Sequence, residues 1–373
     1  MRKVFTFTSV VAILASLAHA NMIGFDLGSN YFKITLMSPG KPFQIVENVA
    51  GGRKTHNQMT IAPEERLYST DSFSSMARYP QTTFVNSVLQ LGVEYNEEEI
   101  ALLRKTKFVM NDFVADERGL VGYEVFSLEK KDKDEGKKEH YFVEEIIAMI
   151  MKYGRTLAET QAGGSVRDSV ITIPSYFNRE RRLMVQQCAE LAGLHVVQMV
   201  HENTAAATYF ALERLDETPI HVLFYNMGAL DTEVTVARYS SVHNTQQNKT
   251  SEMVEILGEA HDQQLGGSHF DDVLVAMLAE RFNAMKANAG QPDVRENTRA
   301  VKRLYKEVVK VKEVLSANKL MQVKVPELLN YVTLDTMVYR SEFEERIASL
   351  ISRVSKPVQD SLEQAGLKPE DID

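Results

Sequence analysis

The sequence predicts an α/β fold built from two related lobes. Two segments share one design: an apolar strand, a polar turn at a glycine, and a second strand in which apolar and polar residues alternate. The segments are 23–36 and 221–239. Their turns lie at Gly28 and Gly228, and a short polar side chain, Asp26 or Asn226, precedes each turn. Because the same design occurs twice, we expect a duplicated unit rather than two unrelated domains.

Helices and strands alternate between the two hairpins. Apolar residues at helical spacing predict a helix over 143–161 that stops at Gly163 and Gly164. A strand, a helix, a strand and a helix follow over 169–174, 178–191, 196–200 and 204–215. This order predicts right-handed crossovers onto a largely parallel sheet.

The chain after the second hairpin has the same mixed character. The spacing of apolar residues predicts helices over 270–287 and 294–316, strand-like structure over 322–339, and further helices from Glu342 onward. The mixed-charge run 129–139 contains no apolar residue, so we expect a solvated hairpin loop there. A partner-docking loop is the alternative for that run.

The composition is that of an ordinary folded protein. Of 373 residues, 44% are hydrophobic and 25% charged, which suits two compact domains and excludes a disordered chain. The net charge of −9 argues against a nucleic-acid binder and against electrostatic binding to an anionic membrane. The single cysteine, Cys188, excludes an internal disulfide and a cysteine-rich zinc site, and its apolar helix neighbours predict a buried packing residue.

The N-terminus has the pattern of a secretory signal peptide. Arg2 and Lys3 precede a short apolar stretch, and Ala18-His19-Ala20 predicts cleavage before Asn21. The alternative, a membrane anchor, needs an apolar run of roughly 20 residues, and this one is well short of that. The sequon at Asn248 predicts an exposed glycosylation site. We therefore expect a soluble protein in a secretory compartment.

The glycine turns predict phosphate chemistry. Backbone N–H groups can converge on a phosphate where no Cβ obstructs the approach, and an aspartate beside them can orient water around Mg²⁺. One such hairpin is weak evidence. Three further segments strengthen it: ITIPSYFNRERR at 171–182, HENTAAATYFAL at 201–212 and LGGSHFDDVL at 265–274.

Together with the hairpins, these segments resemble the nucleotide-binding half of the seventy-kilodalton heat-shock proteins, members of the actin and sugar-kinase fold superfamily. The resemblance extends from Met22 to the last residue. Segments 294–300, 312–319 and 339–346, with the signal peptide, indicate the large endoplasmic-reticulum branch, the hypoxia up-regulated proteins. The resemblance implies a duplicated actin-like ATPase fold with lobe I at 21–205 and lobe II at 206–373. It also implies that the two glycine turns face each other across a nucleotide cleft.

The resemblance also implies an ATP or ADP site with Mg²⁺ at Asp26. Glu202 matches the catalytic glutamate that positions water and metal, and Pro174 and Arg182 match residues that link nucleotide state to the rest of the molecule. The residues implied as nucleotide contacts are Asp26, Gly28, Ser29, Asn30, Tyr31, Glu202, Gly228, Ala229, Gly266, Gly267, Lys312 and Ser316.

Several positions depart from the family pattern. Asn226 replaces an aspartate of the second turn, Ala229 and Leu230 replace glycines, and Asp231 places negative charge where phosphate is expected. Asn30 replaces a hydroxyl residue, Asn203 replaces a proline, and Ser87 stands where hydrolysing members have a lysine near the transferred phosphate. A side chain at a glycine position that needs positive φ costs roughly 1–2 kcal/mol. Since one lost electrostatic group typically costs ~10²–10³ in rate, we expect weak hydrolysis or none.

These matches imply a lumenal chaperone that binds ATP and acts as nucleotide exchange factor for the lumenal seventy-kilodalton chaperone. An active ATPase or small-molecule kinase of the same fold, and an interaction domain that binds no nucleotide, are the alternatives. The family continues beyond the last residue, Asp373, into an adenine-contacting turn, a peptide-binding sandwich and a helical lid. We therefore expect the sequence to be incomplete, with unfolded clients bound by the missing part.

Overall fold

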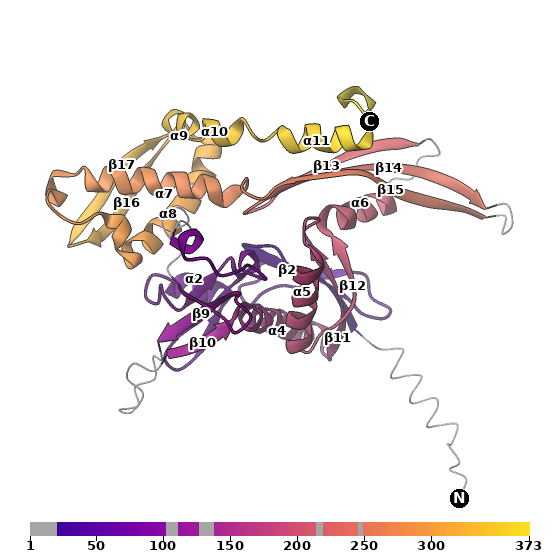
Figure 1. Cartoon of the computed structure of the whole chain (residues 1–373), viewed down its shortest axis with the longest axis horizontal. Coiled ribbons are helices and arrows are strands. Elements are labelled where there is room, and N and C mark those ends of the chain that lie inside the picture. Colours follow the sequence, from indigo (N-terminus) through magenta and orange to yellow (C-terminus); the bar gives the residue numbers. More distant parts are fainter. Residues whose placement is uncertain (1–20, 102–110, 127–137, 214–218, 245–248) are drawn as a thin grey trace, which may run out of the picture. The chain divides into compact units, whose positions relative to one another are not determined.

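The computed structural model describes residues 21–101, 111–126, 138–213, 219–244 and 249–373 (Figure 1). The chain divides into two compact units. Unit 1 comprises the residues up to Phe73, Phe84–Glu94 and Val114–His201, and unit 2 comprises Ser74–Thr83, Tyr95–Phe113 and Glu202–Asp373. The assignment of 21–205 and 206–373 as lobes of one duplicated fold stays a prediction. The signal peptide and Asn248 lie outside the described residues.

Unit 1 is built around a six-stranded mixed sheet. Its strands are β1 (Asn21–Asp26), β2 (Tyr31–Met37), β3 (Gln44–Ile45), β4 (Thr55–His56), β11 (Val166–Ile173) and β12 (His195–His201). The order is β12-β11-β1-β2-β3, with β4 also paired to β2. β11 runs parallel to β1 and β12, whereas β2 runs antiparallel to β1 and β3. The predicted parallel pairing is present in β11 and β12 and extends to β1, and β1 and β2 form the predicted antiparallel hairpin across their tight turn.

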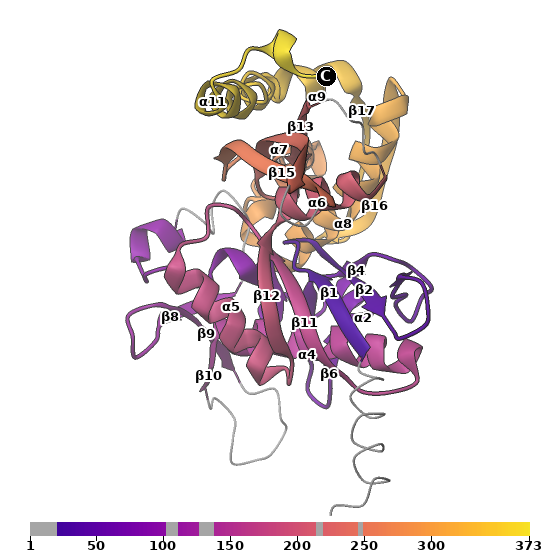
Figure 2. The same ribbon diagram turned by 90° about the vertical axis from the view of Figure 1, so that its right-hand side faces the viewer.

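Two helices of unit 1, α4 (Val143–Ala162) and α5 (Arg179–Leu191), pack against each other (Figure 2). α4 ends at Gly163, whose φ of 69° is the left-handed conformation that favours glycine. Asn178 caps α5 by accepting a hydrogen bond from the N–H of Arg181 at 2.9 Å. Both helices confirm the sequence prediction. Cys188 is fully buried on α5, also as predicted, and burial raises the pKa of its thiol.

Shorter elements complete the N-terminal half. Two three-stranded sheets contain β5 (Gln58–Ile61), β6 (Arg66–Tyr68) and β7 (Thr83–Val85), and β8 (Asp112–Ala115), β9 (Val121–Phe126) and β10 (Lys138–Phe142). A helix α2 (Ser69–Ser75) and a 3-10 turn (Ser87–Leu89) lie among them. β9 and β10 are antiparallel, so the charged run 129–139 joins two strands of a hairpin. Most of that run lies outside the described residues.

In unit 2, the second hairpin belongs to an antiparallel sheet of β13 (Ile220–Met227), β14 (Thr232–Asn244) and β15 (Lys249–Asp262). Helix α6 (Glu202–Glu213) lies against one face of the sheet and α11 (Lys356–Ala365) against the other (Figure 1). Ala207 of α6 and Ala237 and Tyr239 of β14 form the buried centre beneath α6. This core packs the middle of α6 onto the sheet.

A second core of unit 2 lies between two helices and a hairpin. The helices are α7 (Gly267–Asn283) and α8 (Thr298–Ala317), and the hairpin strands are β16 (Leu320–Leu329) and β17 (Val332–Tyr339). Phe282, Leu304 and Val338 are among its buried side chains. The predicted helix over 294–316 begins as a 3-10 turn, because Asn297 caps α8 by accepting from the N–H of Ala300 at 2.9 Å.

The C-terminal elements of unit 2 are short. They are α9 (Arg340–Arg346), α10 (Ala348–Ile351), α11 and a 3-10 turn (Pro369–Asp371). Another 3-10 turn, Lys286–Asn288, follows α7. In the described ranges, no helix is long and apolar enough to cross a membrane.

Candidate functional site

The first glycine turn joins β1 to β2 and requires glycine at Gly28. A Cβ at this position would lie 2.5 Å from the carbonyl oxygen of Tyr31. Asn57 holds the turn from outside: its side-chain amide donates to the carbonyl of Gly28 at 2.7 Å, and its backbone N–H donates to the carbonyl of Asn30 at 2.9 Å. The structure therefore places four predicted contact residues, Gly28, Ser29, Asn30 and Tyr31, in one braced turn.

The carboxylate of Asp26, at the end of β1, has two partners within unit 1. Its Oδ2 lies 2.5 Å from Nζ of Lys33, and its Oδ1 accepts from the hydroxyl of Thr172 at 3.1 Å. The Asp26 side chain is 33% exposed and that of Lys33 is 46% exposed. The residue predicted to face a metal ion thus already faces a cation of the protein.

Sequence analysis missed Lys33, although a signal for it was present. Asp26 and Lys33 are directly opposite each other in the β1–β2 pairing. Opposite residues of an antiparallel pair project from the same face of the sheet. A hairpin that leaves six residues between Asp26 and Lys33 therefore brings these two side chains together.

The second glycine turn has a regular backbone despite its departures from the family pattern. The N–H of Gly228 donates to the carbonyl of Asp231 at 2.8 Å. Neither Ala229 nor Leu230 has a positive φ. The strain of 1–2 kcal/mol considered for these positions therefore does not arise. Leu230 is buried, so its side chain contributes to the core.

Asn226, at the end of β13, bonds to Glu202, the first residue of α6. The Asn226 side-chain amide donates to Oε2 of Glu202 at 3.0 Å. Asn203, which stands at the family's proline position, is buried and donates to the carbonyl of Glu233 and to the hydroxyl of Thr235, each at 3.2 Å. These bonds attach the start of α6 to the sheet and fix the Glu202 carboxylate beside an uncharged amide.

Gly266 precedes α7 and Gly267 is its first residue, and the second turn covers the start of that helix. A Cβ on Gly266 would lie 2.7 Å from backbone atoms of Ala229 and Leu230. The N–H of Gly267 donates to the carbonyl of Gly228 at 2.9 Å, and the N–H of Ser268 donates to the carbonyl of Ala229 at 2.7 Å. The first free N–H groups of a helix are the ones that bind anions. At α7, two of them are used by the turn.

Lys312 and Ser316, the residues predicted to line the adenosine pocket, both lie on α8. Nζ of Lys312 donates to the carbonyl of Gly267 at 2.9 Å and to the carboxylate of Asp271 at 2.8 Å. Burial raises the pKa of Asp271, although Lys312 opposes the shift. The Ser316 hydroxyl donates to the carbonyl of Glu313 at 2.6 Å within the helix. Lys312 therefore links α8 to the start of α7.

The remaining predicted residues of unit 1 have structural contacts. Ser87 is buried and accepts a hydrogen bond from the hydroxyl of Tyr123 at 3.0 Å. Arg182 donates to the carbonyl of Phe177 at 2.8 Å, and its guanidinium lies 3.0 Å from Nε2 of His201. Arg182 thus ties the start of α5 to the end of β12. The predicted approach of the turns at Gly28 and Gly228 across a cleft stays a prediction.

The donor set does not fit a divalent cation. Mg²⁺ in proteins takes carboxylate oxygens, usually with several waters. Here the ammonium of Lys33 stands against Asp26, and the amide of Asn226 stands against Glu202. Within the part of the chain that the structure describes, no cluster of three or more His, Cys, Asp or Glu residues is arranged to hold a metal ion.

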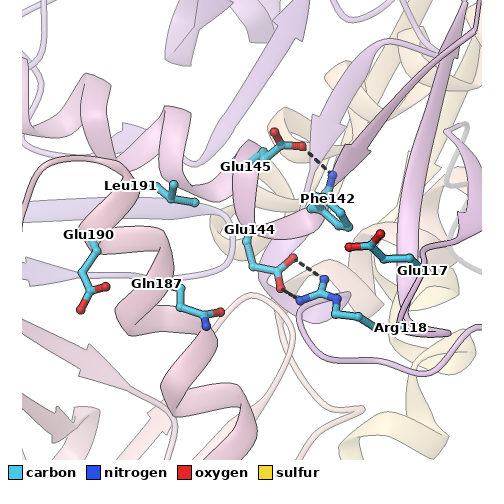
Figure 3. Close-up of a pocket in the computed structure, with 8 residues that line it drawn as sticks. All are labelled: Glu117, Arg118, Phe142, Glu144, Glu145, Gln187, Glu190 and Leu191. Atoms are coloured by element: carbon cyan, nitrogen blue, oxygen red, sulfur yellow. Dashed lines mark hydrogen bonds and ion pairs between the residues drawn. The ribbon is translucent and has the colours of Figure 1, made fainter.

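Unit 1 also contains a pocket of about 530 Å³, shown in Figure 3. It is lined by Glu117, Arg118, Phe142, Glu144, Glu145, Gln187, Glu190 and Leu191. Arg118 is held by Glu144 at 2.7 Å and by Asp116 at 2.6 Å, and these contacts, with Glu144 first, raise the pKa of the guanidinium against the effect of burial. Since four of the lining residues are glutamates and only one is an arginine, the pocket repels phosphate. None of the lining residues is a predicted site residue.

Comparison with known proteins gives consistent matches over almost the whole chain. Residues 22–373 match the family model described as "Hsp70 protein". The chain is 34% identical to Hypoxia up-regulated protein 1 of Xenopus laevis over 93% of the chain and 52% of the relative. It is 33% identical to the protein of that name from Danio rerio over 98% and 36%, and 32% identical to the one from Homo sapiens over 93% and 34%. The resemblance seen in the sequence is confirmed. The chain spans about a third to a half of these relatives' length.

Proposed function

The chain belongs to the Hsp70 family, and we propose that it binds adenine nucleotide, hydrolyses ATP weakly or not at all, and acts in the endoplasmic-reticulum lumen. It is an Hsp70-family chaperone and a distant relative of hypoxia up-regulated protein 1. Membership of this family implies the actin-like ATPase fold, whose nucleotide-binding domain generally binds ATP or ADP with Mg²⁺. Nucleotide binding by this chain is supported by the two glycine turns.

The observation that carries the proposal of weak hydrolysis is the bond between Asn226 and Glu202. A general base needs a lone pair aimed at the proton it removes from water. In this chain, one oxygen of Glu202 accepts from the Asn226 amide at 3.0 Å. An amide in place of a carboxylate also removes one negative charge that would polarise attacking water. The hydrogen bond between Asn226 and Glu202 is therefore a structural contact, and it leaves Glu202 poorly placed to remove a proton from the attacking water.

Calorimetry followed by single-turnover hydrolysis tests this proposal. We expect measurable ATP binding, weaker than in hydrolysing relatives, and turnover near background. Partial recovery requires Asn226→Asp and Ser87→Lys together with glycines at Ala229 and Leu230. Because Ser87 and Leu230 are buried, a melting curve must show that this variant folds. Robust turnover by the unmodified chain contradicts the proposal.

An interaction domain without nucleotide is the second candidate function. It is favoured by the start of α7, where the N–H groups of Gly267 and Ser268 already donate to carbonyls of the second turn. Such a domain needs its shape but no phosphate site. Calorimetry separates the two candidates, because only the first predicts heat on adding ATP or ADP.

We propose the lumenal location from the predicted signal peptide and from the resemblance to the endoplasmic-reticulum branch. Intact-mass analysis of protein from secretory cells should show cleavage before Asn21 and a glycan at Asn248. An unprocessed, unglycosylated chain contradicts this location.

Nucleotide exchange on a lumenal seventy-kilodalton chaperone is the proposed partner activity. An exchange factor acts by binding an open state of its partner more tightly than the closed state, so it does not need to hydrolyse ATP itself. Stopped-flow release of a fluorescent nucleotide from the partner tests this idea. We expect weak acceleration by this chain and strong acceleration by a chain with the full length of its relatives. An unchanged release rate with the longer chain removes exchange from the proposal.

A further inference from the structure

The ammonium group of Lys33 is part of the first glycine turn. Its Nζ lies 3.8 Å from the position that a Cβ would take on Gly28. The side chain is 46% exposed, so a solute can reach it. Because the ammonium lies this close to the turn and is partly exposed, an anion at the turn would meet Lys33 directly.

The neighbours of Lys33 hold it in this position. Thr172 donates to one oxygen of Asp26 at 3.1 Å, and the other oxygen of Asp26 lies 2.5 Å from Nζ of Lys33. An ammonium group has three N–H donors. One of them is directed at Asp26, and two remain to donate to phosphate oxygens.

We propose that Lys33 binds nucleotide phosphate at the first turn through the N–H donors of its ammonium group, in place of a divalent cation, so that this chain binds nucleotide without Mg²⁺. This inference rests on the proposed nucleotide binding. Asp26 then acts as a positioning residue for Lys33 and not as a residue that orients metal-bound water. This role explains why Asp26 contacts Lys33 and Thr172 although the resemblance implied a metal site at this residue.

The test is calorimetric titration of the full 373-residue chain with ATP and ADP, in Mg²⁺ and in EDTA. We expect the same affinity in both buffers. The variant Lys33→Gln should bind about 10- to 100-fold more weakly in EDTA, which is the range for a lost hydrogen bond to a charged group. In Mg²⁺ the loss should be smaller, since Asp26 is then free to face the metal.

Lys138→Gln is the matched control. Lys138 is another strand lysine of unit 1, 49% exposed, and its Nζ lies 2.7 Å from Glu124. This variant should bind as the unmodified chain does, and melting curves of both variants show whether they fold. If the unmodified chain binds nucleotide only in Mg²⁺, the role of Lys33 is overturned and the proposed nucleotide binding stands. If it binds in neither buffer, the proposed function itself fails, and this inference fails with it.

Discussion

At the first glycine turn the carboxylate of Asp26 is paired with the ammonium of Lys33, whereas at the second turn the carboxylate of Glu202 is paired with the uncharged amide of Asn226. Both turns follow a strand of the same hairpin design, and both contacts are short. The first turn keeps the aspartate of the family pattern, and the ammonium of Lys33 lies beside it. The second turn replaces one acid by an amide. The comparison shows that two hairpins of one design surround their carboxylates differently, one with a cation and the other with a neutral amide.

The two turns differ in what surrounds them. The first pair is partly exposed, so an incoming anion can reach Lys33 while Asp26 stays bound to it. The second turn is covered by α7, since two helix N–H groups donate to its carbonyls. We therefore expect ligand binding to depend more on the first turn than on the second.

The largest effect on the free energy of unfolding is expected from replacing a glycine of either turn region, Gly28 or Gly266, by alanine. Gly266→Ala places a Cβ 2.7 Å from backbone atoms of the second turn, and Gly28→Ala places one 2.5 Å from a carbonyl of the first. Each substitution should lower the free energy of unfolding by about 3 kcal/mol, the upper part of the range for overpacking. Denaturant unfolding measures this.

Gly24→Ala is the control for both glycines, because its Cβ meets only an ordinary contact at 3.9 Å with Thr35. This variant should change the free energy of unfolding by less than either turn variant. If Gly266→Ala is as stable as the unmodified chain, the second turn can move away from the added Cβ. The close cover of that turn by α7 would then not distinguish it from the first turn.

A smaller effect is expected from Asn226→Asp. The change places a second carboxylate beside Glu202, 3.0 Å from the replaced amide, and should lower the free energy of unfolding by about 2 kcal/mol at pH 7. Two adjacent carboxylates raise each other's pKa, so the loss should shrink as pH falls toward about 4 and grow as pH rises. Melting curves across this pH range measure it.

Adding Mg²⁺ tests the cause of the Asn226→Asp effect. It should raise the melting temperature of this variant and leave that of the unmodified chain unchanged. Asn330→Asp is the control: Asn330 donates at the same distance, 3.0 Å, to the uncharged side chain of Gln291. If Asn330→Asp shows the same pH dependence, repulsion from Glu202 is not its cause.

The smallest effect is expected from Arg353→Gln. Asp262, on β15, lies opposite Thr232 of β14 in the strand pairing, just after the second turn. Its carboxylate forms an ion pair with Arg353 at 2.5 Å. Burial alone raises the pKa of Asp262, but the Arg353 guanidinium and the N–H of Gln264 hold it below its usual value. A carboxyl group with a lowered folded pKa stabilises the fold above its unfolded pKa of about 3.9, and that contribution is lost as pH falls through the folded value.

Arg353→Gln should therefore cost about 1 kcal/mol at pH 7, and nothing once Asp262 is protonated at low pH. Thermal melts from neutral to acidic pH measure this difference. Arg340→Gln is the control, because its partner Glu344 is 55% exposed. A pH-independent difference between Arg353→Gln and the unmodified chain would assign the effect to packing.

Much of the secondary structure could be predicted because its signals are local. Asn178 and Asn297 cap helices, Gly163 ends one, and strict alternation marks the strands of both hairpins. Cys188 is buried together with Val185 and Ala189 on one face of α5, whereas its apolar helix neighbours Leu183 and Leu191 are exposed. The hairpin of β1 and β2 and the parallel pairing of β11 with β12 could be predicted in this way, whereas the short strands β3 and β4 beside β2 were not predicted.

The sequence by itself determined the family, the two glycine turns and the loss of an aspartate at Asn226, because these depend on residue type and spacing along the chain. Only the tertiary structure decided which group neutralises each carboxylate. The hydrogen bond from Asn226 to Glu202 joins β13 to α6, and the hydrogen bond from the N–H of Gly267 to the carbonyl of Gly228 joins α7 to the second turn. Such contacts depend on how separate elements pack, and no periodicity of the chain encodes that packing.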